Sequence, residues 1–179
     1  MQEFAAKSLE KAIRDVVNFP KEGIIFKDIT TLLKKGDLFA NAVDYMYDHF
    51  RNESIDMIAA IESRGFIFGA ALAYKLNIGL VPIRKPGKLP ARTLTETYEL
   101  EYGTDKVEIH RDAVKAGTKV LLVDDLLATG GTALASCNLL TRLKSEIVGV
   151  VFLIELTFLK GRDRLKDYNV YSLIKYDKE

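Results

Sequence analysis

Two adjacent acids and a run of small and hydroxyl-bearing residues follow an apolar segment in the second half of the chain. Residues 120–123 read Val-Leu-Leu-Val, and Asp124 and Asp125 come directly after them. Two leucines then lead into a loop of small residues, Ala128, Thr129, Gly130, Gly131 and Thr132. Glycines let backbone amides approach a ligand, threonines add hydroxyl donors, and a following helix offers free N–H groups and a positive dipole end. This pattern predicts a phosphate-binding loop.

The acid pair indicates what carries the phosphate. Two carboxylates next to a phosphate repel it unless they meet hydroxyl groups or a metal ion. A ribose 5-phosphate fits, because Asp124 and Asp125 can accept hydrogen bonds from its 2- and 3-hydroxyls. Mg²⁺, which prefers oxygen ligands, would be held mainly by the substrate and through water by Asp124 or Asp125. The alternative, acids that only end a strand before a simple turn, is disfavoured by the order strand, acid pair, threonine-rich loop and helix.

Other nucleotide-binding patterns do not fit this loop. It lacks the Gly-x-x-x-x-Gly-Lys-Ser/Thr spacing of nucleotide triphosphatases and the Gly-x-Gly-x-x-Gly spacing of dinucleotide folds. His49 and His110 have no metal-ligand spacing with each other, and Cys137, inside an expected helix, is assigned to packing. The phosphate loop is therefore the main chemical signal.

Apolar strands alternate with helical patterns from residue 55 onward, and these elements must position the loop. Strands are predicted at 55–61, 78–83, 119–125, 147–155 and 170–174, and helices at 66–76 and 132–143. This alternation predicts an α/β fold with a mainly parallel twisted sheet flanked by helices. Ligands bind at the carboxyl ends of the strands in such sheets, which is where the loop begins.

The segments around this sheet are expected to cover it. An amphipathic helix is predicted over residues 4–17, an extended segment over 24–26, and a second helix capped by Asp37. Residues 1–35 would thus form a small N-terminal hood. Residues 85–113 lack a strong core pattern and are expected to form a flexible loop, with an exposed hairpin around Gly103.

Composition limits the function classes. A chain of 179 residues, 48% of them hydrophobic, is expected to form one domain, residues 1–179. Its 26 basic and 25 acidic residues nearly cancel, which argues against nucleic acid or an anionic membrane as a partner. No apolar stretch reaches the roughly 20 residues of a membrane span, and the first residues lack the apolar run of a secretory signal, so a cytoplasmic location is expected.

Residues 120–132 resemble the motif that binds 5-phosphoribosyl-1-diphosphate (PRPP) in type I phosphoribosyltransferases, and residues 124–132 resemble its adenine-using members. Further segments resemble the same family in the same order, at 18–28, 62–69, 83–90 and 98–103. The resemblance covers nearly the whole chain. It implies the type I fold with a mobile catalytic loop, transfer of phosphoribose from PRPP to adenine with Mg²⁺, purine salvage, and a homodimer.

The resemblance also implies a diphosphate site. The segment that binds diphosphate in the family corresponds here to Glu62, Ser63, Arg64 and Gly65. Arg64 suits the task, because a guanidinium donates in bidentate fashion to phosphate oxygens, and is also expected to act in catalysis. Without the resemblance, a role for Arg64 in a surface ion pair is an equally good interpretation. Basic residues that approach the neighbouring subunit's diphosphate would be Arg84, Lys85 and Lys88.

Base recognition and proton transfer are likewise implied by the resemblance. Glu101 would lie beside N7 of adenine as general acid or base, and Tyr102 would pack against the closed loop. Without the resemblance, Glu101 is not distinguished from Glu96, Glu99 and Glu108. Adenine contacts are implied for Ile25, Phe26, Lys27 and Leu156, with the backbone of Ile25 or Lys27 reading the base edge and core packing as the alternative for Ile25, Phe26 and Leu156.

Two other readings remain open. A phosphoribosyltransferase for xanthine, hypoxanthine or orotate would share the ribose-phosphate site, although residues 19–28 favour adenine. A PRPP-sensing transcription regulator would bind without turnover, but the chain has no spare length or basic recognition helix for DNA binding.

Overall fold

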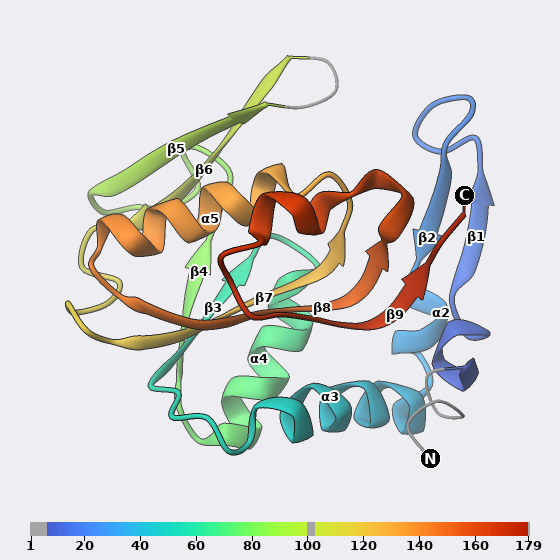
Figure 1. The fold of residues 1–179 in the computed structure, drawn as a ribbon, viewed down its shortest axis with the longest axis horizontal. Helices are drawn as coiled ribbons and strands as arrows, with labels where there is room; N and C mark the ends of the chain where they lie inside the picture. Colours follow the sequence, from blue (N-terminus) through green and yellow to red (C-terminus); the bar gives the residue numbers. More distant parts are fainter. Residues whose placement is uncertain (1–6, 100–102, 179) are drawn as a thin grey trace.

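A five-stranded sheet forms the centre of the computed structural model, which describes residues 7–99 and 103–178 (Figure 1). Every neighbouring pair in it is parallel, which confirms the predicted sheet. In spatial order the strands are β4 (Gly79–Ile83), β3 (Met57–Ile61), β7 (Lys119–Leu127), β8 (Glu146–Leu156) and β9 (Val170–Tyr176).

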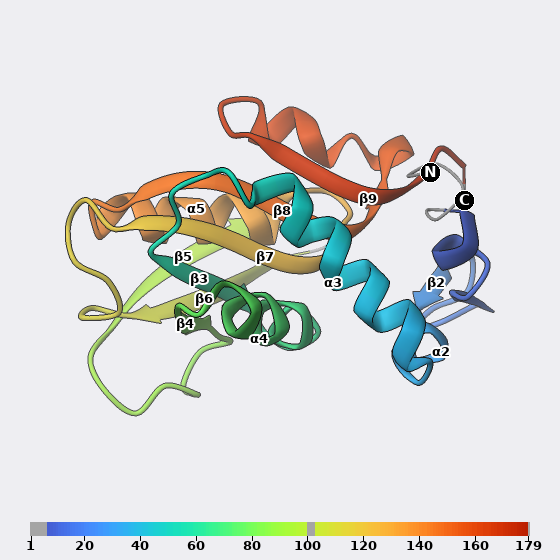
Figure 2. The ribbon, with the colours of Figure 1, turned by 90° about the horizontal axis from the view of Figure 1, so that it is seen from below.

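Helices cover both faces of this sheet. The helices α3 (Gly36–Phe50) and α4 (Gly65–Leu76) lie against one face, as Figure 2 shows, and α5 (Gly131–Arg142) covers the other. Parallel strands are buried on both sides, so their sequences are apolar throughout rather than alternating. In β7 the four residues before the acids are 0% exposed. The central strand therefore fixes the backbone from which the acid pair projects.

A hairpin of β5 (Thr93–Glu99) and β6 (Thr104–His110) packs on the outer side of α5 (Figure 1). The predicted hairpin around Gly103 is confirmed, but the expectation of little core structure in this stretch is wrong. Val107 and Ile109 are 1% and 0% exposed, because alternate side chains of the hairpin pack against the helix. Paired backbone hydrogen bonds of 2.9 and 2.7 Å join Arg84, just past β4, to Glu108.

The N-terminal segment departs from its prediction. Residues 7–10 are helical, but the helix predicted over 4–17 does not continue: β1 (Arg14–Val17) pairs antiparallel with β2 (Ile25–Asp28). The β-branched Val16 and Val17 suit a strand, and pairing with β2 satisfies their backbone groups. The predicted extended segment is confirmed as β2. This N-terminal hairpin stands beyond the carboxyl end of the sheet, beside β9 (Figure 1).

Short helices complete the chain. The helix α2 (Thr30–Leu33) leads from β2 to α3, whose N-cap residue is Lys35. Asp37 lies in the first turn of α3 and is not its cap, contrary to the prediction, although an acid there still complements the helix dipole. After β8 come two 3₁₀ helices, η1 (Thr157–Leu159) and η2 (Gly161–Leu165). Within the described ranges, no helix is both long and apolar enough to cross a membrane.

Candidate active site

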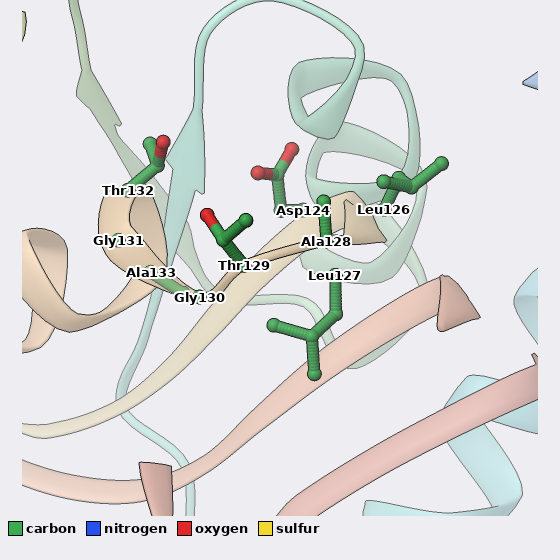
Figure 3. A pocket seen from close by; sticks show the side chains of 9 residues that line it. All are labelled: Asp124, Leu126, Leu127, Ala128, Thr129, Gly130, Gly131, Thr132 and Ala133. Atoms are coloured by element: carbon green, nitrogen blue, oxygen red, sulfur yellow. The ribbon is translucent and has the colours of Figure 1, made fainter. Parts of the chain in front are cut away.

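A small cavity of about 80 Å³ lies where β7 passes into α5. Figure 3 shows the side chains of Asp124, Thr129 and Thr132 on one side of the loop, whereas Leu127 points away. The first turn of α5 adjoins the same cavity, so its free backbone N–H groups are available to an anion. All five loop residues predicted to bind phosphate line this cavity: Ala128, Thr129, Gly130, Gly131 and Thr132.

Gly130 has the left-handed backbone conformation that the loop needs, with a φ of +81° at the start of α5. A Cβ at this position would lie 2.5 Å from the carbonyl oxygen of Gly161. Only glycine therefore fits, both for conformation and for space. The loop is held in one shape by a neighbouring segment of backbone.

The two acids lie inside β7, which runs two residues further than predicted. Asp125 is 5% exposed, and its Oδ2 is 2.7 Å from Nε of Arg64. Burial raises the pKa of Asp125, although the positive charge of Arg64 acts to lower it. Burial and then the charge of Asp125 raise the pKa of Asp124 well above its usual range. Two carboxylates kept in such surroundings are typical of a functional site.

A second cavity, of about 360 Å³, opens between the N-terminal hairpin and the carboxyl end of the sheet. It brings together one residue of the hairpin, the segment after β3, the start of the segment after β4, and the acid pair. Ile61 and Leu126, which the sequence did not single out, also line it. The predicted site residues in its lining are Phe26, Glu62, Ser63, Arg64, Lys85, Asp124, Asp125 and Thr132.

Arg64 connects the two sides of this larger cavity. Its guanidinium carbon lies 4.9 Å from the centre of the Phe26 ring, a cation–π distance, while its Nε contacts Asp125. The next residue, Gly65, is packed so closely that a Cβ would lie 2.8 Å from Oδ1 of Asp124. The segment after β3 is therefore locked against the acid pair.

Glu62 gathers the basic residues predicted for the diphosphate. It accepts hydrogen bonds from Arg84 Nε at 3.2 Å, from the Lys85 amide at 3.0 Å, and from the Lys88 ammonium. Burial alone would raise the pKa of Glu62, but these hydrogen bonds lower it to about 2. The cations of Arg84 and Lys88 are thus assembled at one acid beside the larger cavity, together with the backbone amide of Lys85.

The side chain of Lys85 reaches the hairpin instead of Glu62. Its Nζ is 2.7 Å from the hydroxyl of Tyr98 and forms an ion pair with Asp105. The contacts of Lys85 with Tyr98 and Asp105 were not predicted from the sequence. The register around Gly103 pairs them directly, so a correct hairpin register is the signal that would have found them.

Other predicted residues lie elsewhere or outside the described ranges. Lys27 is buried and forms a 2.8 Å ion pair with Asp15, and Ile25 faces Val17 in the N-terminal hairpin. Neither they nor Leu156, which ends β8, line the larger cavity formed by the described residues. Their adenine contacts remain predictions, as does the mobility of residues 85–113. Both remaining predicted residues fall outside the described ranges, namely Glu101 and Tyr102.

A parallel sheet that carries a glycine-rich loop and an acid pair beside two cavities is the arrangement expected of a phosphoribosyltransferase. The model of the phosphoribosyl transferase domain family matches residues 28–178. An adenine phosphoribosyltransferase of Koribacter versatilis is 55% identical over 171 residues, 96% of this chain and 94% of its own.

Solved structures agree. The adenine phosphoribosyltransferase of Thermoanaerobacter pseudethanolicus superposes with a TM-score of 0.93 at 51% identity, covering 96% of this chain and 99% of its own. That of Saccharomyces cerevisiae, solved with adenine and an imino-altritol bisphosphate, gives 0.90 at 41%, covering 96% and 99%. The chain belongs to the adenine phosphoribosyltransferase family of type I phosphoribosyltransferases.

Proposed function

We propose that the chain transfers the 5-phosphoribosyl group of PRPP to adenine and releases AMP and diphosphate, a reaction of purine salvage. The observation that carries this proposal is the continuity of the site. A phosphate loop, an acid pair and two cations, Arg64 and Lys85, line adjoining cavities beneath the aromatic ring of Phe26. Each part of PRPP and the base thus has chemically suited neighbours.

In this reaction the bond between C1 of the ribose and N9 of adenine forms as the bond from C1 to diphosphate breaks. The transition state resembles an oxocarbenium ion, with negative charge growing on the leaving diphosphate. Arg64 and Lys85 line the larger cavity and suit that growing charge. Asp124 and Asp125 would hold the ribose hydroxyls, and the loop at 128–132 the 5-phosphate. No covalent bond to the protein is required.

The base would lie against the N-terminal hairpin. Phe26 offers its ring to the cavity, so it suits stacking on a purine better than its neighbour Ile25 does. Glu101 would exchange a proton with N7 of adenine. The yeast relative holds adenine together with a bisphosphate, which supports adenine as the base here.

We also propose Mg²⁺ as the cofactor. The donor set fits, because burial raises the pKa of both Asp124 and Asp125, so a cation beside them would offset the cost of their charges. Their carboxylate oxygens are also the kind of ligand that Mg²⁺ prefers. In the described part of the chain no group of three or more His, Cys, Asp or Glu side chains is placed to hold an ion by itself. Substrate oxygens would supply most ligands, with Asp124 or Asp125 acting through water. When bound, Mg²⁺ would offset the charge of the diphosphate.

Chelation should therefore abolish turnover. With excess EDTA, AMP formation is expected to fall by at least about 100-fold, because metal ions supply several kcal/mol of charge stabilisation. Added Mg²⁺ should restore the rate, which a continuous assay of diphosphate release would follow. Full activity in EDTA after extensive dialysis against chelator would contradict the proposed cofactor.

The outward face of α4 supports a homodimer, which we propose as the assembly. Ile67 and Tyr74, seven residues apart and thus on one side of the helix, are 39% and 90% exposed. Tyr74 also lines an apolar groove of about 300 Å³ together with Phe39, Val43 and Ala71. Large apolar side chains left in contact with water favour association.

Tyr74→Glu is expected to weaken this dimer by at least about 30-fold, since buried interface tyrosines commonly contribute 2 kcal/mol or more. Light scattering coupled to size exclusion would show a mass shift toward the monomer at micromolar concentration. Val17→Glu, at a valine of β1 that is 66% exposed, is the control and should stay dimeric. A monomeric wild-type protein, or a dimeric Tyr74→Glu, would sink the proposal.

The activity itself is tested by mixing the protein with PRPP, Mg²⁺ and adenine. Equal amounts of AMP and diphosphate are expected, and neither without PRPP. Because PRPP and AMP are intracellular metabolites, the cytoplasm is the proposed location. A protein that binds PRPP without forming AMP would instead be a sensor, the second function considered for this fold.

A further inference from the structure

An ion pair between a buried acid and a partly exposed arginine lies outside both cavities, between β8 and η2. Glu155 is 3% exposed, and Arg162 donates to it in bidentate fashion, Nε to Oε1 at 2.8 Å and Nη2 to Oε2 at 2.6 Å. Arg162 also donates to the carbonyl of Val170 at 2.8 Å and to Oγ of Ser172 at 3.1 Å. Ser172 in turn donates to Glu155. The guanidinium is therefore fixed by four acceptors on two strands.

Stability alone does not account for this ion pair. Burial would raise the pKa of Glu155, but the hydrogen bonds from Arg162 and Ser172 lower it, so the carboxylate is ionised at neutral pH. The Arg162 side chain is 39% exposed, and water screens the attraction of a partly exposed ion pair, so its charges contribute little to stability. What a bidentate pair adds is a fixed geometry, and Arg162 adjoins the first residue of η2, Gly161.

Gly161 is buried directly against the phosphate loop. A Cβ on Gly161 would lie 2.1 Å from the carbonyl oxygen of Ala128 and 2.9 Å from the amide nitrogen of Gly130. The reverse is also true, since a Cβ on Gly130 would lie 2.5 Å from the Gly161 oxygen. The two backbones touch with no space for a methyl group. Any shift of Gly161 must therefore be passed to the loop.

The other end of η2 is fixed as well. Leu165 is 0% exposed in the apolar cluster beneath α5. With Leu165 in the core and Arg162 held by Glu155 and Ser172, the backbone of Gly161 has one position. Close packing of this kind transmits small displacements rather than absorbing them.

We infer that Arg162, held by Glu155 and Ser172, is a positioning residue for the 5-phosphate loop. It sets Gly161 against Ala128 and Gly130, and so fixes the loop's backbone groups where the phosphate binds. Among the described residues that line either cavity, Arg162 does not occur, so it acts through Gly161 and not by contact with substrate. The inference rests on the proposed function only in taking the phosphate to be that of PRPP.

The test compares Arg162→Gln with Arg164→Gln, an exposed arginine two residues further along η2. Calorimetry would measure the Kd for ribose 5-phosphate, and steady-state kinetics would measure KM for PRPP, KM for adenine and kcat. In Arg162→Gln the Kd for ribose 5-phosphate and the KM for PRPP are expected to rise about tenfold or more, because small misplacements of binding groups have large effects. The KM for adenine at saturating PRPP should stay within about twofold. Arg164→Gln should match the wild type.

Two further variants distinguish a misplaced loop from a loss of folded protein. Ser172→Ala keeps the bidentate pair and should raise the same two constants by a smaller factor. Gly161→Ala leaves the ion pair intact but crowds Ala128, and should weaken ribose 5-phosphate binding as Arg162→Gln does. Gly36→Ala, where a Cβ meets nothing within 4 Å, is its control.

The outcomes separate the inference from the proposed function. The inference is wrong if folded Arg162→Gln binds ribose 5-phosphate as the wild type does. It is also wrong if the only change is a fall in kcat that matches the fraction of protein that has unfolded, because Arg162 would then be merely structural. If the wild type itself fails to bind ribose 5-phosphate, the proposed function falls and the inference falls with it. A selective loss in Arg162→Gln, Ser172→Ala and Gly161→Ala, absent from both controls, supports the inference.

Discussion

Asp124→Asn is expected to stabilise the protein while lowering kcat/KM for PRPP by about 100-fold, because a hydrogen bond to a charged acceptor contributes about 1.5–3 kcal/mol. Asparagine keeps the shape of the side chain, and its Oδ1 can still accept the 2.9 Å hydrogen bond from the Asp125 amide. What it loses is the negative charge that would hold a ribose hydroxyl. Turnover and stability should therefore move in opposite directions.

The stability gain follows from the sign of the pKa shift. Burial, then repulsion by Asp125, raises the folded-state pKa of Asp124 above its unfolded value. The stability associated with this group is therefore complete below the unfolded pKa, about 3.9, and is lost as pH rises through the higher folded-state pKa. Asparagine carries no charge at any pH in this window. Its free energy of unfolding should exceed that of the wild type at neutral pH, with the difference shrinking toward pH 4.

Urea unfolding from pH 4 to pH 8, together with the PRPP kinetics, checks this prediction. Asp112→Asn, an exposed acid in the loop after β6, is the matched control and should change neither quantity. Asp125 is a less clean choice, because its removal also deprives Arg64 of a partner at 2.7 Å. A variant of Asp124 that is both less stable and fully active would contradict the assigned role.

Glu101→Gln is expected to lower kcat by about 100-fold or more, in line with the usual contribution of general acid–base catalysis. The structure narrows the choice among the glutamates of this region. Glu96 accepts hydrogen bonds from Asn138 at 3.1 Å and Arg142 at 2.9 Å. Glu108 accepts hydrogen bonds from the Thr95 hydroxyl at 3.1 Å and from the Gly87 amide at 3.2 Å. Both are thereby explained as structural groups on the body of the hairpin.

Glu99→Gln is the matched control, since Glu99 ends β5 two residues earlier and is exposed. Its kcat should stay within about twofold of the wild type. The Glu101→Gln rate should also lose the pH dependence of the wild-type kcat that arises from this carboxyl group. Equal losses in both variants, or none in Glu101→Gln, would remove Glu101 from its proposed proton role.

The parallel sheet and the glycine-dependent shape of the loop at 128–132 were predictable from the sequence because each depends on a local pattern. Buried strands are apolar throughout, and a loop with φ at +81° demands the glycine found at position 130. The acid pair was placed correctly because it directly follows the apolar part of β7. Such features require no knowledge of distant residues.

Features that depend on long-range pairing were missed. Arg14–Val17 is a strand because β2 lies beside it, and its valines satisfy a helical period equally well. Tyr98 and Asp105 meet Lys85 only through the hairpin register. Gly161 lies 31 residues from Gly130 and touches it only in the folded chain, so no local spacing indicated its role.

The most direct test of the central claim is turnover with PRPP and Mg²⁺ when adenine, hypoxanthine, guanine and xanthine are supplied in turn. AMP from adenine, with kcat/KM for the other bases lower by at least about 100-fold, is the expected result, because a site built to hydrogen-bond one base leaves buried polar groups unpaired with another. Preferred turnover of another base would keep the phosphate loop and the acid pair but contradict the assignment of adenine.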